Sequence, residues 1–239
     1  MERWAIHIDI EGFGALYDQE DQILWSLGDL MEGIFYIGSK CYPEPPDRIF
    51  AHQIGDGFII VSDFGSKSLE VPVSIAIALL RHVAANGRLA KVTIAEGELF
   101  DIQGCYPKTI RDAKESDGRV FMGAGLMTIS PVMGTALIRA VGIDKKSPSG
   151  SLLIIKKDDH HRIPQDLPVT EILDLNLCSI DWVHAESELV NNIQEIVGLN
   201  HPDFGELEHK ISDYCNTYDL KESWKKNTYY YLSINKKDA

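Results

Sequence analysis

The sequence predicts an α+β fold whose elements follow the order β-α-β-β-α-β. Three observations support this prediction. An alternating, β-branched run opens the chain, an Asp-Gly pair at residues 56–57 separates two more strand-like runs, and helical periodicity appears on either side of that hairpin. This order is the split β-α-β arrangement of ferredoxin-like folds.

The first strand is expected over residues 4–10, which alternate in polarity and run directly into a glycine-bearing turn at residues 11–14. Apolar residues recur at helical spacing over residues 18–38, so a helix is expected after the turn. Residues 42–46 contain three prolines and are expected to form a loop, because proline removes a backbone donor and interrupts any ladder.

The next elements are a hairpin, a helix and a strand. Two β-rich runs, at residues 48–53 and 58–64, flank the Asp-Gly pair, which is a strong hairpin signal. A second helix is expected over residues 68–86, because an Asn-Gly pair ends its apolar pattern. Residues 91–95 are expected to form the fourth strand and complete the repeat.

The pattern of the remaining sequence predicts that the chain divides into two parts. We expect a catalytic domain at residues 1–160 and a helical C-terminal extension at residues 161–239, because a charged run at residues 156–162 separates them and helical patterns follow it. The remaining expected elements are a polar loop or flap at 101–119, a short helix at 134–140, a strand at 151–155, and helices at 184–197 and 204–218.

Composition and charge narrow the possible partners. The chain has 239 residues, of which 44% are apolar and 25% charged, as expected of a globular protein with its own core. Its formal net charge of −13 opposes binding to DNA or RNA duplexes, which depends on neutralising phosphates. The four cysteines are widely spaced without a C-x-x-C pair, so we expect no zinc site.

The protein is expected to be cytoplasmic and to have no membrane partner. Its longest largely apolar run, residues 71–80, is far shorter than the roughly 20 residues that cross a bilayer. Charged residues lie among the first positions, where a secretory signal would carry an apolar segment.

Two aspartates are the most informative residues. Asp9 ends the first strand where it meets the glycine turn, and Asp56 lies at the tip of the hairpin. In a β-α-β-β sheet the first strand lies beside the hairpin, so both carboxylates can meet at one end of the sheet. Two carboxylates and a backbone carbonyl are typical ligands of Mg²⁺ on a polyphosphate. The alternative is that each aspartate only stabilises a turn.

The sequences around these aspartates resemble a known family. The runs IDIEGF at residues 8–13 and IGDGF at residues 54–58 are similar to the signature of class III nucleotidyl cyclase catalytic domains, an Asp-Ile-x-Gly-Phe turn followed by a Gly-Asp hairpin. The resemblance covers roughly residues 4–156 and implies the nucleotidyl cyclase fold.

The resemblance also implies a two-metal reaction. In this family the ribose 3′-hydroxyl of a nucleoside triphosphate attacks the α-phosphate, pyrophosphate leaves, and a 3′,5′-cyclic monophosphate forms. Carried over by position, Asp9 and Asp56 would bind two Mg²⁺ or Mn²⁺ ions, and the Ile10 carbonyl would complete one site.

The family also implies how phosphates and subunits are arranged. The backbone amides of Glu11, Gly12 and Phe13 would hold the β- and γ-phosphates. Such enzymes form head-to-tail dimers with their sites at the subunit interface, so the resemblance implies a homodimer.

One helix departs from the family pattern. Relatives typically carry Asn-x-x-x-Arg, whose Arg stabilises charge in the transition state. Here Arg139 fits the Arg position, and Thr135 stands where Asn is expected. The Thr hydroxyl can still hydrogen-bond to a ribose. A surface position for Arg139 is an equally open interpretation.

The base-recognition positions depart as well. Purine-specific relatives usually place Lys or Glu four residues before the hairpin Asp, where this chain has His52, with Phe50 two residues earlier. This resembles the pyrimidine cyclases of Pycsar-type antiphage defence, which make cyclic UMP or cyclic CMP. His52 could hydrogen-bond a pyrimidine edge and Phe50 could stack on it. The alternatives are a half-buried strand histidine and, as the preferred interpretation of Phe50, a core residue.

Two other functions stay open besides a cyclase that uses UTP or CTP. An adenylyl or guanylyl cyclase with atypical base contacts would need the same metal ligands. A catalytically inactive cyclase fold could instead bind a nucleotide as a sensor. The retained pair of aspartates argues against the sensor, since a dead site needs neither charge, whereas Thr135 argues for it.

Overall fold

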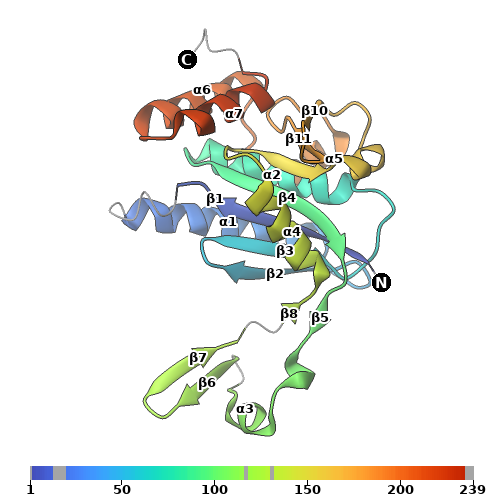
Figure 1. The fold of residues 1–239 in the computed structure, drawn as a ribbon, viewed down its shortest axis with the longest axis vertical. Coiled ribbons are helices and arrows are strands. Elements are labelled where there is room, and N and C mark those ends of the chain that lie inside the picture. Colours follow the sequence, from blue (N-terminus) through green and yellow to red (C-terminus); the bar gives the residue numbers. More distant parts are fainter. Residues whose placement is uncertain (1, 13–19, 116–117, 130–131, 235–239) are drawn as a thin grey trace.

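The computed structural model describes residues 2–12, 20–115, 118–129 and 132–234. At its centre lies a seven-stranded sheet in the order β10-β11-β9-β4-β1-β3-β2 (Figure 1). Neighbouring strands are antiparallel, except that β4 and β9 run parallel. The strands are β1 (Arg3–Ile10), β2 (Ile49–Ile54), β3 (Gly57–Ser62), β4 (Ala90–Gly97), β9 (Leu153–Lys156), β10 (Val169–Ile172) and β11 (Leu177–Ile180).

The first four strands confirm the expected fold class. Their spatial order β4-β1-β3-β2, with α1 (Glu20–Cys41) and α2 (Glu70–Ala85) as the connecting helices, is the split β-α-β arrangement of an α+β ferredoxin-like fold. Residues 18 and 19, where the first helix was expected to start, lie outside the described residues.

Helix α2 is buried on nearly all sides. It packs against β4, β1 and α1, and against α5 (Glu188–Val197) on its other side. Its sequence is apolar around most of its circumference, which is typical of a fully buried helix. Its buried cation, Arg81, donates hydrogen bonds to the Trp182 and Val183 carbonyls, each at 3.0 Å. Within the described part of the chain, no helix has the length and hydropathy of a membrane span.

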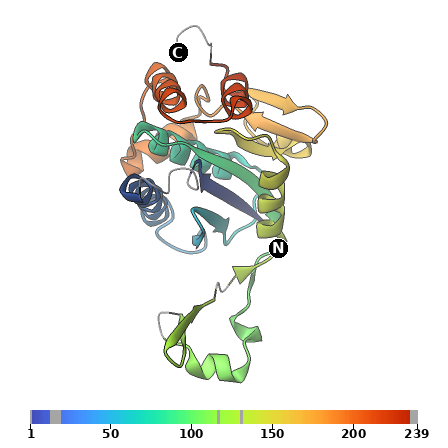
Figure 2. The ribbon, with the colours of Figure 1, turned by 60° about the vertical axis from the view of Figure 1, so that its left-hand side comes forward.

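The opposite face of the sheet carries α4 (Thr135–Lys146). Figure 2 shows α4 and α1 on opposite sides of the sheet. Small residues bring α4 close to the strands, since Ala136 and Ala140 are fully buried and Thr93 Oγ1 donates to the Ala140 carbonyl at 2.9 Å. The short helix expected at residues 134–140 is therefore present and extends further.

Residues 161–187 correct the expectation of a wholly helical extension. Strands β10 and β11 form a hairpin there that pairs with β9 and widens the central sheet. Each strand has only four residues, too few to show a clear period of two. The helical part begins later, with α5, α6 (Phe204–Thr217) and α7 (Glu222–Tyr231). The helices expected at 184–197 and 204–218 are confirmed as α5 and α6.

Residues 98–115, 118–129 and 132–134 belong to an arm that projects from the body of the protein (Figure 1). At its base β5 (Phe100–Asp101) pairs with β8 (Val132–Met133), and at its far end β6 (Arg119–Met122) and β7 (Gly125–Thr128) form a hairpin beside α3 (Lys108–Ala113). For residues 101–119 the sequence led us to expect a polar loop or flap. Several apolar side chains of the arm are exposed: Phe100, Phe121, Met122, Leu126 and Met133.

Candidate active site

Asp9 and Asp56 lie at the same end of the central sheet. In the β1–β3 pairing Asp9 is opposite Gly57, so Asp56, one residue earlier in the hairpin turn, lies next to Asp9. Glycine at position 57 permits this approach, because a Cβ atom there would be 2.7 Å from Asp9 Oδ1. The two carboxylates therefore meet as the sequence led us to expect, and their role as metal ligands stays a prediction.

The two carboxylates perturb each other. The pKa of Asp9 is raised to about 7, first by burial and then by the charge and the hydrogen bond of Asp56, with smaller effects of Asp144 and Glu11. A cation between the two side chains would act in the opposite direction. The donor set is thus chemically suited to a hard divalent cation, although the described residues contain no cluster of three or more possible metal-ligating side chains.

A lysine beside the pair is already engaged. Lys91 lies opposite Asp9 on β4. Its Nζ is 3.1 Å from Asp144 Oδ1 and 3.2 Å from the Asp144 carbonyl oxygen, near the end of α4. Lys91 therefore mainly neutralises Asp144, and the Asp9–Asp56 pair keeps its excess negative charge. Sequence reasoning missed both residues of this ion pair, which are far apart in the chain.

His7 is a second residue that sequence reasoning missed. It lies two positions before Asp9, so both side chains are on the α4 face of β1. His7 is buried, and its pKa is lowered mainly by burial, with opposing effects of Asp144 and Lys91. Its Nδ1 has no hydrogen-bond partner among the described residues. The alternation of β1 was the signal that could have identified this buried imidazole beside the acidic pair.

The turn after β1 is partly tied into the sheet. The Glu11 backbone N–H donates to the Leu89 carbonyl at 2.9 Å. This amide was expected to hold phosphate, and the bond to Leu89 engages it in the arrangement described. Gly12 follows with a φ of 78°. The expectation for the Gly12 amide stays a prediction, and Phe13 lies outside the described residues.

Two aromatic residues of the C-terminal helices also reach this turn. Trp224 Nε1, from α7, donates to Glu11 Oε2 at 2.7 Å, and the Tyr214 hydroxyl, from α6, donates to the Glu11 carbonyl at 3.0 Å. The pKa of Glu11 is raised to about 7 by burial, against the lowering effects of the Trp224 hydrogen bond and the Lys91 charge.

Thr135 and Arg139 lie toward the other end of the sheet. Thr135 Oγ1 accepts a hydrogen bond from the Glu98 backbone N–H at 2.9 Å. Arg139 Nη1 donates to the Glu96 carbonyl at 2.8 Å, and Glu96 pairs with Trp4 on β1. Trp4 precedes Asp9 by five residues, or about 16 Å along a strand. Within one chain, the basic and acidic candidates therefore do not come together.

Phe50 and His52 lie on the edge strand β2, on the same face as His7 and Asp9. His52 and His7 are both cross-strand partners of Ile59, so their strands are about 10 Å apart. Burial lowers the pKa of His52, and its Nε2 has no hydrogen-bond partner among the described residues. Phe50 is 37% exposed and carries the Arg48 guanidinium at 5.6 Å from its ring centre, so it is not a core residue.

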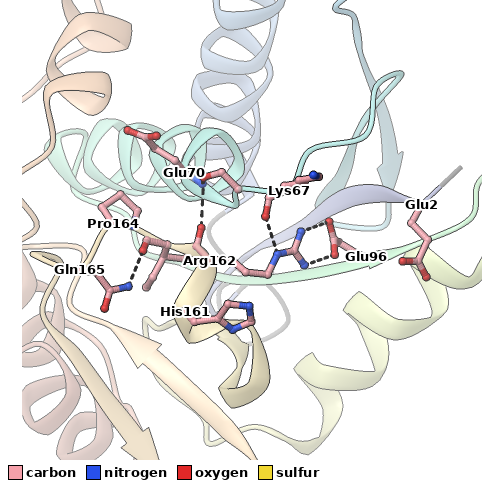
Figure 3. A pocket seen from close by; sticks show the side chains of 10 residues that line it. Glu2, Lys67, Glu70, Glu96, His161, Arg162, Pro164 and Gln165 are labelled. Atoms are coloured by element: carbon pink, nitrogen blue, oxygen red, sulfur yellow. Dashed lines mark hydrogen bonds and ion pairs between the residues drawn. The ribbon is translucent and has the colours of Figure 1, made fainter.

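A pocket of about 800 Å³ lies at the Arg139 end of the sheet (Figure 3). Its wall contains a paired set of charges. Arg162 Nη2 donates to Glu96 Oε1 at 2.8 Å, and Arg162 also contacts Asp159 at 3.2 Å. These contacts raise the pKa of Arg162 above its usual range. The ion pairs explain Glu96 as a structural residue, and the pocket is separate from the acidic pair.

No protein-family model matches the sequence, and no curated protein matches it either. Solved structures do match. The guanylyl cyclase domain of the RhoGC fusion protein from the aquatic fungus Blastocladiella emersonii, in a monomeric crystal structure of a double mutant, aligns with a TM-score of 0.50 at 11% identity, over 75% of this chain and 92% of that one. This similarity shows a shared fold.

Two further matches have lower TM-scores. A bacterial light-regulated adenylyl cyclase aligns with a TM-score of 0.45 at 10% identity, over 87% of this chain and 57% of that chain. A class III adenylyl cyclase-like ATP-binding protein from Pseudomonas aeruginosa aligns with a TM-score of 0.43 at 14% identity, over 82% and 40%.

Proposed function

We propose that this chain, which has the fold of a nucleotidyl cyclase catalytic domain, is itself a nucleotidyl cyclase. It would convert a nucleoside triphosphate into the 3′,5′-cyclic monophosphate and pyrophosphate. The observation that carries the proposal is the convergence of Asp9 and Asp56 at one end of the sheet, with the pKa of Asp9 raised to about 7. Such a crowded pair of carboxylates is costly unless a cation neutralises it.

The proposed cofactor is a pair of Mg²⁺ or Mn²⁺ ions. Asp9 and Asp56 would hold them through their carboxylates, and Ile10, the next residue after Asp9, would offer its backbone carbonyl. Bound divalent ions lower the pKa of an attacking hydroxyl and neutralise charge on a phosphoryl group.

The residues of the chain would then orient the triphosphate. The Gly12 amide would donate to a phosphate oxygen at the acidic end of the sheet. The ribose 3′-oxygen would form a bond to the α-phosphorus while the bond to pyrophosphate breaks, and the hydroxyl proton would leave to solvent. Arg139 would donate to the oxygens on which negative charge grows, and the Thr135 hydroxyl would contact the ribose.

A complete site would need a second copy of the chain. Arg139 and the acidic pair lie at opposite ends of one sheet, about 16 Å apart along the strand direction. A head-to-tail homodimer would bring the Arg139 end of one subunit to the acidic end of the other. The exposed apolar side chains of the arm support such an association, because a monomer would leave them in water.

For the base, we propose a pyrimidine, so that the substrate is UTP or CTP. His52 Nε2, which has no hydrogen-bond partner among the described residues, can exchange a hydrogen bond with a pyrimidine edge, and the partly exposed Phe50 ring can stack on it. The product, cyclic UMP or cyclic CMP, would act as a cytoplasmic signal in antiphage defence.

The test is to incubate the purified protein with ATP, GTP, CTP or UTP in Mn²⁺ or Mg²⁺ and to identify the products by mass. One cyclic monophosphate and an equal amount of pyrophosphate are expected, from UTP or CTP. A cyclic purine nucleotide would support the cyclase proposal but overturn the assignment of a pyrimidine base. Nucleotide binding without product from a folded dimer would favour the inactive sensor, in which the Thr135 hydroxyl only accepts the Glu98 N–H.

A further inference from the structure

The C-terminal helices contact the turn that follows β1. Trp224 and Tyr214 are both buried, and they come from different helices, α7 and α6. Their only polar side-chain atoms, Trp224 Nε1 and the Tyr214 hydroxyl, donate to the same residue, Glu11, at 2.7 and 3.0 Å. The two rings are 6.1 Å apart and lie at an angle of 38°.

These contacts hold Glu11 in a defined position. Its carbonyl accepts the bond from Tyr214 and its carboxylate the bond from Trp224, while its backbone N–H donates to the Leu89 carbonyl at 2.9 Å. Three hydrogen bonds, with α7, with α6 and with the residue before β4, therefore anchor a single residue, and both donating rings belong to the main hydrophobic core. Glu11 directly follows Ile10, so its position determines where the end of β1 presents its backbone.

The direction of the Glu11 carboxylate also matters. Asp9 and Asp56 already carry excess negative charge, and Glu11 adds to the electrostatic effects on Asp9. A Glu11 side chain released from Trp224 would be free to approach this pair and to repel triphosphate. The hydrogen bond from Trp224 keeps the carboxylate on the side of α7.

We propose that Trp224 and Tyr214 are positioning residues of the cyclase site, which act through Glu11 to hold the turn at residues 10–12 and to keep the Glu11 carboxylate away from the bound triphosphate. The inference rests on the proposed function and deepens it. The helical extension is then a working part of the catalytic unit, although neither aromatic residue touches the reacting atoms.

The test compares Trp224→Phe with the wild-type dimer. Loss of the N–H should raise the KM for the nucleotide about tenfold, the cost of a hydrogen bond to a charged group, with a smaller change in kcat. Tyr214→Phe should raise KM about threefold. Because turnover depends on the cyclase proposal, Mn²⁺ affinity of the protein without nucleotide is measured as well, and Trp224→Phe should weaken it.

Two controls separate positioning from packing. Trp4→Phe makes the same substitution at a buried tryptophan at the other end of β1, whose Nε1 has no hydrogen-bond partner among the described residues. Tyr230→Phe removes an exposed hydroxyl from α7. Trp4→Phe should lower the melting temperature, and neither control should change KM or Mn²⁺ affinity.

A double-mutant cycle tests the route through Glu11. If Trp224 acts by holding the Glu11 carboxylate, Trp224→Phe should have much less effect on KM and Mn²⁺ affinity in a Glu11→Gln background. Equal effects in both backgrounds would overturn the inference, as would a Trp224→Phe protein with unchanged KM and Mn²⁺ affinity. A wild-type protein without turnover would reject the cyclase, and Mn²⁺ affinity would still decide the role of Trp224.

Discussion

The two ends of the central sheet differ in how their partly buried carboxylates are paired. At the Arg139 end, Glu96 is paired with Arg162, and this contact raises the pKa of the arginine above its usual range. At the other end, Asp9 lies beside Asp56, and the pKa of Asp9 is raised to about 7 because the second carboxylate adds to the effect of burial. One end satisfies its charges internally, whereas the other is left with an excess of one sign.

This difference predicts that the paired charges affect mainly stability and the crowded carboxylates mainly activity. The folded state tolerates a paired, partly buried carboxylate because its partner offsets the cost of removing it from water, and loss of the partner destabilises the fold. A crowded pair of carboxylates opposes folding through like-charge repulsion, and a bound cation relieves that repulsion. Substitutions in these two groups of charges should therefore differ in kind: we expect those in the Glu96–Arg162 pair to affect the folded state and those in the Asp9–Asp56 pair to affect turnover.

The largest effect is expected from Asp56→Asn. Replacing one carboxylate of the pair should lower kcat/KM by at least about 10³-fold, because phosphoryl charge loses its main source of neutralisation. The melting temperature should stay the same or rise, since a like-charge contact is removed. Cyclase assays and thermal unfolding of the same preparation measure both. Near-normal turnover in this variant would reject the two-metal mechanism.

Mixing two inactive variants should restore activity. Arg139→Ala should lower turnover by about 10²-fold or more, as expected for loss of a charge-stabilising group. Mixed with Asp56→Asn and allowed to exchange subunits, it should recover about a quarter of the wild-type activity, because half of the dimers would be mixed and one of their two sites complete. If activity does not recover after subunit exchange has been verified, Asp56 and Arg139 would belong to a site formed within a single chain.

A smaller effect, of a different kind, is expected from Arg162→Met. This change leaves the Glu96 carboxylate without its cation, and both side chains are mostly buried. The free energy of unfolding should fall by about 1–3 kcal/mol. Denaturant titration measures the loss, and turnover of the remaining folded protein should change far less than in Asp56→Asn. A stable but inactive Arg162→Met protein would contradict the contrast between the two ends.

The smallest effect is expected from His184→Gln. His184 lies between Asp181 and Glu208, each 2.9 Å away, and these contacts raise its pKa above 6.5 although burial lowers it. A raised pKa means that the protonated form stabilises the folded state. The contribution is complete below about pH 6.5 and is lost as pH rises through the raised pKa.

The pH dependence of unfolding checks this expectation. His184→Gln should lower the melting temperature by roughly 1–2 °C at pH 6, as expected for a partly exposed ion pair, and the difference from wild type should shrink toward pH 9. A difference that grows with pH would have the wrong sign and would show that His184 is held in its neutral form.

The acidic end of the sheet could be predicted because its signals are local. Alternation in β1 and the Asp-Gly hairpin determine the strand pairing, and that pairing brings Asp9 to Asp56. The same alternation would have identified His7. The position of Arg139 within α4 was predictable too, but its distance from the acidic pair was not, because it depends on which end of the sheet the helix N-terminus covers.

Other features had weak or no local signal. Strand β10 has four residues, and its Thr170 and Glu171 do not mark it as part of a sheet. The arm hairpin around Phe121 exposes its apolar residues, so no buried pattern reveals it. The contact of Trp224 with Glu11 joins residues 213 positions apart, and an aromatic residue on an amphipathic helix can pack in many places.

That separation has a consequence for the synthesis of the protein. At about 5–20 residues per second, a ribosome needs roughly 10–40 s to travel from Glu11 to Trp224. For most of that interval, from the addition of Asp56 onward, the nascent chain has both aspartates but lacks the α7 donor that anchors the turn after β1. A fragment released early would carry the whole acidic pair and still fall short of a working site. Under the proposed function, full affinity for the nucleotide would then be reached only after α7 has left the ribosome and folded.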